Sequence, residues 1–246
     1  MGTSKSFKGI KGNPNWSNLS RTVTLSCTTG SIDESKLAKV ANKYVQLLGG
    51  SNYGGRGRSN IGGRAGIKTA QKLGRFLSDV KSKGFGSTIY AIGYRIGDKP
   101  DPNEIINFIL EYCAGVASTI DEVAAKAAEG ELLSEIGGEA KDFEELAKNF
   151  EDKINEYGIE ELLIRFYAYY IYEHLSVTLY EKLIKDKGKN ATSNFFRQLK
   201  KYLVERINNI SRKRDLSKIE WANREGEELV KNIFEGTLKA FEYYES

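Results

Sequence analysis

The sequence predicts an all-α fold, an irregular bundle of about seven or eight helices preceded by an extended N-terminal arm. Beyond residue 33, apolar residues recur at spacings of three and four, as on the buried face of a helix. No alternation of strands with helices is recognisable. Residues 1–32, in contrast, are rich in Gly, Ser, Thr, Asn and Lys and lack that periodicity. We therefore divide the chain into an arm (1–32), with one short strand near Val23–Leu25, and a helical domain (33–246).

The helical domain opens with an amphipathic helix through residues 37–48. Ser31 or Asp33 can cap its start, and Gly49 ends it. A loop rich in glycine and arginine follows at residues 49–66. Further helices are expected over residues 67–80, 87–93, 101–115, 119–136, 143–158, 160–187, 195–210 and 217–241.

Three local signals support these boundaries. Asp101-Pro102 opens one helix with proline in its first turn, where the missing N–H costs nothing. Thr119 and Glu122 form a capping box, and Ser217 with Glu220 suggests a second one before the last helix. The segment 160–187 is apolar on nearly every side, which is typical of the buried centre of a bundle.

Composition excludes several classes of protein. The chain has 246 residues, of which 40% are hydrophobic and 28% charged, an ordinary globular balance. Two cysteines and a single histidine provide neither a disulfide framework nor a zinc site, so no metal is expected. No apolar run approaches the ~20 residues of a membrane span, and no secretory signal is recognisable. We expect a cytoplasmic protein in a reducing compartment that makes no membrane contact.

Charge is distributed unevenly along the chain. Residues 1–100 carry 17 Lys and Arg against four Asp and Glu, whereas residues 101–246 carry 20 against 29. The basic half therefore faces something anionic, which is either nucleic acid, a nucleotide, an acidic partner or the acidic half of the same chain.

The residues that could carry catalysis do not form a recognisable arrangement. His174 lies within a tyrosine-rich helix, and nothing around Cys27 or Cys113 indicates a nucleophile with its base. Paired glutamates lie on amphipathic helices, where acid clusters are normally solvated. We therefore expect a protein that is not an enzyme and has no cofactor of its own.

The glycine- and arginine-rich loop offers a weak binding signal. The stretch Gly63–Thr69 is similar to a phosphate-binding loop, but Ile67 separates glycine from lysine, so only the N–H groups of the following helix remain to hold an anion. Flexible basic tracts also bind nucleic-acid backbones. The alternative to a nucleic-acid-binding module is a simple linker between helices. The cations concerned are Arg56, Arg58, Arg64 and Lys68.

The N-terminus carries a further signal. After removal of Met1, Gly2 presents an unhindered α-amine, whose pKa of about 7.7–8.0 leaves a usable neutral fraction. Gly2 and Ser6 also satisfy the loose myristoylation pattern, which has meaning only in a eukaryotic cell. Many chains begin Met-Gly without any such role.

At this point the chain resembles QatB-like proteins, components of the bacterial Qat anti-phage defence systems. The resemblance is carried by Met1–Phe7, then Gly9, Lys11–Pro14 and Trp16-Ser17, and it continues through residues 70–79, 119–122 and 166–169 into the C-terminal helices. Family members tend to have a longer proline-rich segment before the tryptophan, whereas here only Pro14 remains.

This resemblance implies a bacterial, non-enzymatic partner protein. The family is encoded beside an ATPase, a QueC-like enzyme and a TatD-like nuclease. QueC-type enzymes activate a carboxy-deazaguanine with ATP, and their relatives in defence systems are thought to transfer it to a protein's N-terminal amine. The resemblance therefore implies a covalent deazaguanine adduct at Gly2. The segment that would bind the QueC-like partner comprises Thr3, Ser4, Lys5, Phe7, Lys11, Pro14 and Trp16.

Overall fold

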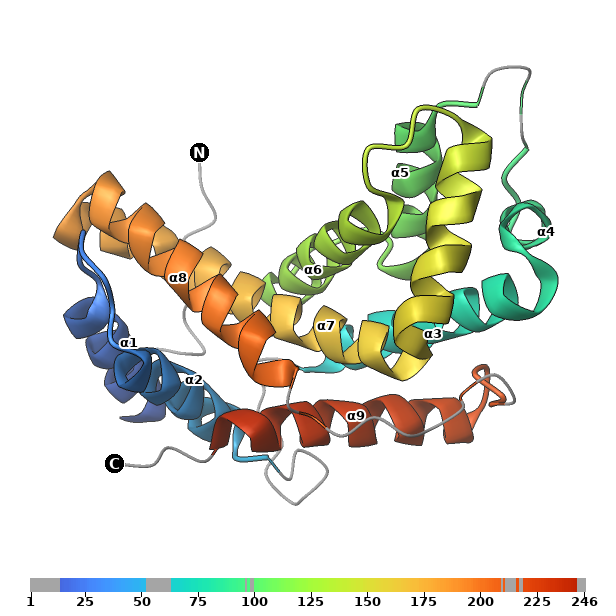
Figure 1. The fold of residues 1–246 in the computed structure, drawn as a ribbon. Helices are drawn as coiled ribbons and strands as arrows, with labels where there is room; N and C mark the ends of the chain where they lie inside the picture. Colours follow the sequence, from blue (N-terminus) through green and yellow to red (C-terminus); the bar gives the residue numbers. More distant parts are fainter. Residues whose placement is uncertain are drawn as a thin grey trace.

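The structure, a computed structural model, describes residues 14–51, 63–95, 97, 100–208, 210, 216 and 219–242. Within these residues the chain forms nine helices and no strand, which confirms the all-α prediction (Figure 1). The helices are α1 (Pro14–Ser26), α2 (Glu34–Leu48), α3 (Arg64–Lys83), α4 (Phe85–Ala91), α5 (Pro102–Cys113), α6 (Ile120–Gly137), α7 (Phe143–Lys187), α8 (Lys189–Ile207) and α9 (Arg224–Glu242).

Helix α7 is the centre of the bundle. It bends at Gly158, whose φ of 76° and ψ of 161° lie outside the helical range and suit a residue without a Cβ. The part after Gly158 is buried nearly all round, with Phe166, Tyr167 and Tyr170 fully enclosed. The predicted break at Gly158 and the buried segment that follows it are therefore confirmed.

The other helices are arranged around α7. Helix α6 packs along it on one side and α8 on another, while α3 and α9 cross it (Figure 1). Helices α1 and α2 form a pair that packs against α8 and α9 at the left of that view. Helices α5 and α6 lie at the opposite end, beside the first part of α7.

Three predicted helix starts are confirmed by their hydrogen bonds. The Asp33 carboxylate accepts from the Ser35 N–H at 2.8 Å, and Asp101 caps α5 ahead of its proline. Thr119 and Glu122 form the expected capping box at α6. Gly49 ends α2 with a left-handed φ of 99°.

The extended arm is wrong for residues 14–26, which form α1, and no strand is present at Val23–Leu25. Leu19 and Val23 are spaced one turn apart and are both fully buried, mainly against α2. The Ser and Thr content hid this helix, because these residues favour caps and turns over helix interiors. Here their hydroxyls bond carbonyls one turn back, as Thr22 does to Asn18 at 2.8 Å, so tertiary packing outweighs local preference.

The start of the last helix also differs from the prediction. Ser217 lies outside the described residues, and Glu220 and Trp221 precede the helix instead of forming its first turn. Helix α9 begins at Arg224, with the Asn223 side chain accepting from the Glu225 N–H at 2.9 Å. Asn223 is therefore the residue whose side chain caps α9.

Candidate functional site

The N-terminal segment that the sequence singled out lies largely outside the described residues. Pro14 is exposed and begins α1, so α1 starts at the surface of the helical body. Trp16 is half-buried and packs against the hydrophobic core, so it is not a free aromatic anchor on an extended arm. The site residues outside the described part are Gly2, Thr3, Ser4, Lys5, Phe7 and Lys11.

Helix α1 and the loop after it are fastened to three other helices. The Asn15 side chain donates to the Gln46 carbonyl of α2 at 3.1 Å, and Lys182 of α7 donates to the Ser20 hydroxyl at 2.5 Å. The loop after α1 is held on α8, where Asn194 donates to the Thr28 carbonyl at 2.8 Å. The N-terminal segment therefore begins from a fixed platform.

The glycine- and arginine-rich stretch is held at both ends, although residues 52–62, including Arg56 and Arg58, lie outside the described part. At its start, the Ser51 hydroxyl donates to the carboxylate of Glu242 in α9. At its end, Arg64 and Lys68 lie exposed on the first two turns of α3, so the expected loop ends at Gly63 and not at residue 66.

Asp121 of α6 caps the start of α3. Its carboxylate accepts from the N–H groups of Gly63 at 3.1 Å and Ala65 at 2.9 Å. The Tyr170 hydroxyl donates to the same carboxylate and accepts from Gly63 N at 2.6 Å. The expectation that these N–H groups could hold an external anion is therefore wrong, because a carboxylate of the chain itself occupies the position.

Removing this cap should destabilise the protein. We expect Asp121→Asn to lower the free energy of unfolding by about 1–2 kcal/mol, since one carboxylate oxygen becomes an NH2 group that cannot accept from either amide. Urea denaturation gives the change, and Asp152→Asn, a substitution at an exposed acid of α7, is the matched control. Equal stability of the two variants would contradict the assignment.

His174 lies in a buried aromatic cluster beside this cap. Its ring meets Tyr44 edge-on at a centroid distance of 5.6 Å and lies 6.0 Å from Tyr170. Only 2% of its surface is exposed, so a bulk substrate does not reach the imidazole. The structure therefore gives His174 a packing role.

A second buried polar group lies between α5 and α6. Glu129 is fully buried, and neither carboxylate oxygen has a well-formed hydrogen bond within the described part of the chain. Burial raises the pKa of Glu129 well above its ordinary value, and Cys113, the Ala114 backbone, Lys126 and Lys72 offset this only in part. The sequence did not single out Glu129, although it lies four residues after Ala125 and three before Leu132, the spacing of one buried helix face.

Both thiols are poor nucleophiles. Burial raises the pKa of Cys27, and burial with the neighbouring Glu129 raises that of Cys113 well above its usual range. No group of three His, Cys, Asp or Glu side chains that could hold a metal ion occurs among the described residues. In the same part of the chain, no helix is long and apolar enough to cross a bilayer.

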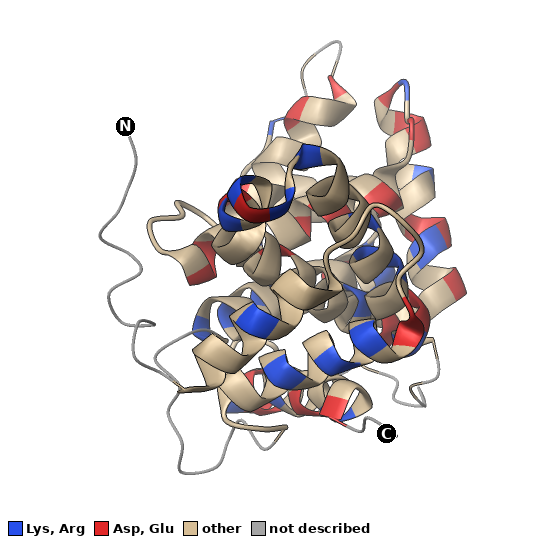
Figure 2. Cartoon of the chain, turned by 90° about the vertical axis from the view of Figure 1, so that its left-hand side faces the viewer, with Lys and Arg blue, Asp and Glu red and all other residues tan. Residues whose placement is uncertain are grey.

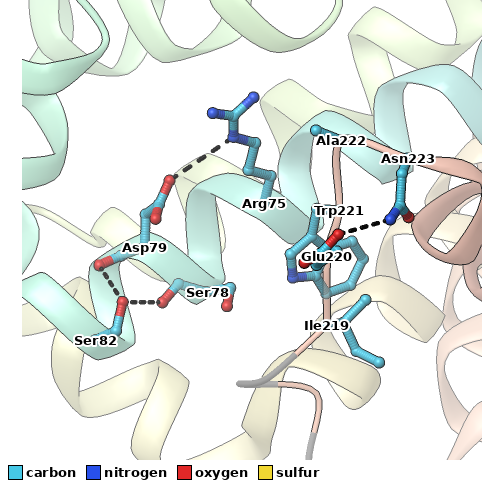
Figure 3. Close-up of a pocket in the computed structure, with 9 residues that line it drawn as sticks. All are labelled: Arg75, Ser78, Asp79, Ser82, Ile219, Glu220, Trp221, Ala222 and Asn223. Atoms are coloured by element: carbon cyan, nitrogen blue, oxygen red, sulfur yellow. Dashed lines mark hydrogen bonds and ion pairs between the residues drawn. The ribbon is translucent and has the colours of Figure 1, made fainter.

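A surface hollow of about 310 Å³ lies between α3 and the turn before α9 (Figure 3). Arg75 and Asp79 of α3 form one wall, 3.9 Å apart, and Asp79 also pairs with Lys83 at 2.6 Å. Trp221 forms the other wall, and the Gln71 amide holds its carbonyl at 2.7 Å. The carboxylates of this hollow are already paired, and it holds no nucleophile with a base.

The comparison with known protein families finds a match over most of the helical body. The family model described as "Qat anti-phage system associated protein QatB" matches residues 54–241, more than half of the chain. No curated protein and no solved structure matches. The matched range spans α3 to α9 and does not include the N-terminal segment, α1 or α2. The chain therefore belongs to the QatB family and is a component of a Qat anti-phage defence system.

Proposed function

We propose that this protein is a non-enzymatic component of its defence system, and that its N-terminal Gly2 amine is recognised and conjugated to a deazaguanine by a QueC-like partner enzyme. Family membership supports a role within the Qat system. The observation that supports an acceptor role is the position of α1, which starts at the surface with exposed Pro14 and is fastened to α2 and α7.

The length of the N-terminal segment suits delivery to another enzyme. Eleven residues lie between Gly2 and Pro14, and the twelve Cα–Cα steps permit a reach of at most roughly 40 Å when extended. An active site that is closed around its nucleotide requires such a reach. Because ordering a peptide costs entropy, binding needs side-chain anchors. Phe7 is the aromatic residue of the segment that precedes α1 in the sequence and would serve as the anchor, and Lys5 and Lys11 would add charge complementarity.

The chemistry places one demand on this chain, a neutral primary amine. The amine nitrogen attacks the acyl carbon of the adenylated deazaguanine carboxylate, the bond to the phosphate oxygen breaks, AMP leaves, and the nitrogen loses a proton. The partner supplies ATP-dependent activation. Glycine has no side chain to obstruct this attack, and a pKa of about 7.7–8.0 provides the neutral form at cellular pH.

Intact-mass measurement after co-expression with the neighbouring genes tests the proposal. We expect the peptide beginning at Gly2 to gain the mass of one deazaguanine acyl group. Gly2→Glu retains Met1, so the nitrogen of residue 2 stays in a peptide bond and is no free amine. This variant should lose the adduct and phage protection. Gly2→Ala keeps a processed primary amine and is the matched control.

Two results would refute the conjugation. One is an unmodified mass when the whole system is expressed. The other is full phage protection by Gly2→Glu. Neither result would affect membership of the QatB family. The ATPase and the TatD-like nuclease of the system are further proposed partners.

The alternative function is a nucleic-acid-binding module built on the glycine- and arginine-rich stretch. Its support is that Arg64 and Lys68 are exposed and have no carboxylate within 4.0 Å among the described residues. Binding that disappears when Arg56, Arg58 and Arg64 are changed to glutamine would favour this alternative.

A further inference from the structure

Positive charge is concentrated where α1, α2, the end of α7 and the start of α8 meet. We call this surface the basic face. Residues 14–48 and 181–197 contain nine lysines and arginines against four carboxylates, Asp33, Glu34, Glu181 and Asp186. The nine cations are Arg21, Lys36, Lys39, Lys43, Lys182, Lys185, Lys187, Lys189 and Arg197.

These cations lie on neighbouring elements of the fold. Helix α1 packs on α2 and α7, and α2 packs on α8. Lys182 reaches Ser20, next to Arg21, and Lys187 is close enough to Cys27 to affect its pKa. Figure 2 looks onto this side of the molecule, and blue segments follow the helices nearest the viewer.

None of the nine cations has a carboxylate oxygen within 4.0 Å in the described part of the chain. Elsewhere, lysines and arginines do pair, as Lys126 does with Glu111 and Arg165 with Glu135. The acidic residues are concentrated at the other end, where residues 101–161 contain 17 Asp and Glu against four Lys. Two cations of α3, Arg75 and Lys83, pair with Asp79 of the same helix, whereas the basic face has no such partner among the described residues.

Helix α2 presents its lysines in a single row. Lys36, Lys39 and Lys43 follow spacings of three and four, on the side of the helix opposite the buried Ala41 and Val45. At 1.5 Å per residue the row is about 10 Å long. Lys36 and Lys39 are exposed, and Lys43 is half-buried and bonds to Gln46 at 2.9 Å. A rigid helix therefore holds three uncompensated cations in line.

The character of the face favours a nucleic acid over a protein partner. Protein–protein interfaces have apolar centres and are depleted in lysine. Leu25 is the one large hydrophobic residue of α1 and α2 that is well exposed, at 70%. Single-stranded binding relies on exposed aromatic platforms. Trp16 packs on the core, and Tyr180 packs against Phe196, so neither is free for stacking.

We propose that the basic face binds the phosphate backbone of double-stranded nucleic acid without reading its sequence. Lysine side chains on α2 would contact phosphates, with Arg21 and the cations of the α7–α8 junction alongside. This surface differs from the glycine- and arginine-rich stretch. Its part on α1 and α2 precedes residues 54–241, the range that the family model matches. The proposal does not depend on conjugation at Gly2.

Fluorescence anisotropy with the full chain and a labelled 24-base-pair DNA duplex tests the proposal. We expect binding that weakens about a hundredfold between 50 and 200 mM salt if four phosphates are contacted. The triple variant Lys36→Gln, Lys39→Gln, Lys43→Gln should lower the affinity by about tenfold or more and reduce the salt slope by up to about 2.7, which is three contacts. Glutamine and lysine have similar helix propensities, so α2 should remain folded.

The matched control removes the same charge elsewhere. Lys81→Gln, Lys141→Gln, Lys148→Gln changes three exposed lysines of α3, of the turn before α7 and of the start of α7, which do not form the basic face, and it should leave the salt slope unchanged. Equal losses in both triple variants would indicate a net-charge effect and would overturn the proposal. It would also be overturned if wild-type protein did not bind the duplex at 50 mM salt, or if only Arg56→Gln, Arg58→Gln, Arg64→Gln abolished binding. Loss of self-association instead of DNA binding in the α2 variant would assign the face to a second copy of the chain.

Discussion

Replacing Gly74 with alanine is expected to lower the free energy of unfolding by about 2–3 kcal/mol. A Cβ at this position in α3 would lie 2.2 Å from the ring of Trp221, which is 4% exposed. Trp221 has little room to move. The Gln71 amide holds its carbonyl, and α9 is packed so closely against it that a Cβ built on Gly226 would lie 2.6 Å from the Trp221 carbonyl oxygen. The turn before α9 would therefore have to shift. Urea denaturation measures the loss.

Gly236→Ala is the matched control for this prediction. Gly236 lies within α9, and nothing is within 4 Å of the Cβ it would gain. Alanine there should stabilise the protein by up to about 1 kcal/mol, since glycine is the weaker helix former. The double variant Gly74→Ala, Trp221→Leu should recover part of the loss by making room. Two glycine variants of equal stability would show that the contact with Trp221 is unimportant.

Changing Glu129 to glutamine is expected to remove a pH dependence of stability. Burial raises the folded-state pKa of Glu129 well above its ordinary value of 4.5. Below pH 4.5 the carboxyl is protonated in both states and carries no penalty. Above it, the unfolded chain releases the proton while the folded chain keeps it, so stability falls by about 1.4 kcal/mol per pH unit until the folded-state pKa is reached.

Urea denaturation at pH 5 and pH 7 checks this expectation. The stability of Glu129→Gln relative to wild type should rise between the two values, because only the wild type keeps a buried carboxyl that must hold its proton. Glu122→Gln is the control, and its difference from wild type should stay constant between pH 5 and pH 7. Bonds from Ser118 and Thr119 lower the pKa of Glu122 to about 2, so its stabilisation is present above pH 4.5 and is lost as pH falls toward 2. A Glu129→Gln difference that does not change with pH would refute the prediction.

The family relationship is shown by one part of the chain. The sequence resemblance ran through nearly the whole chain with its specific motif in residues 1–17, whereas the family model matches residues 54–241. The helical body therefore carries the family relationship. The proposed acceptor, Gly2, lies before the matched range, and its role depends on the experiment described above.

Local chemistry determined much of the fold. Asp33, Asp101-Pro102 and the Thr119–Glu122 capping box predicted three helix starts, because capping is decided by residues within one turn. The apolar segment after Gly158 predicted the centre of the bundle, because a helix that is hydrophobic all round must be buried.

Tertiary structure alone decided the remainder. Whether residues 14–26 form a helix depended on α2, since only packing of Leu19 and Val23 compensates for a Ser- and Thr-rich segment. Asp121 and Glu129 are both acids of α6, and the sequence does not distinguish the helix cap from the buried carboxyl. The charge asymmetry was visible in the sequence, but its target was not. Which cations lie beside carboxylates depends on distances between segments far apart in the chain, and these exist only once the helices pack.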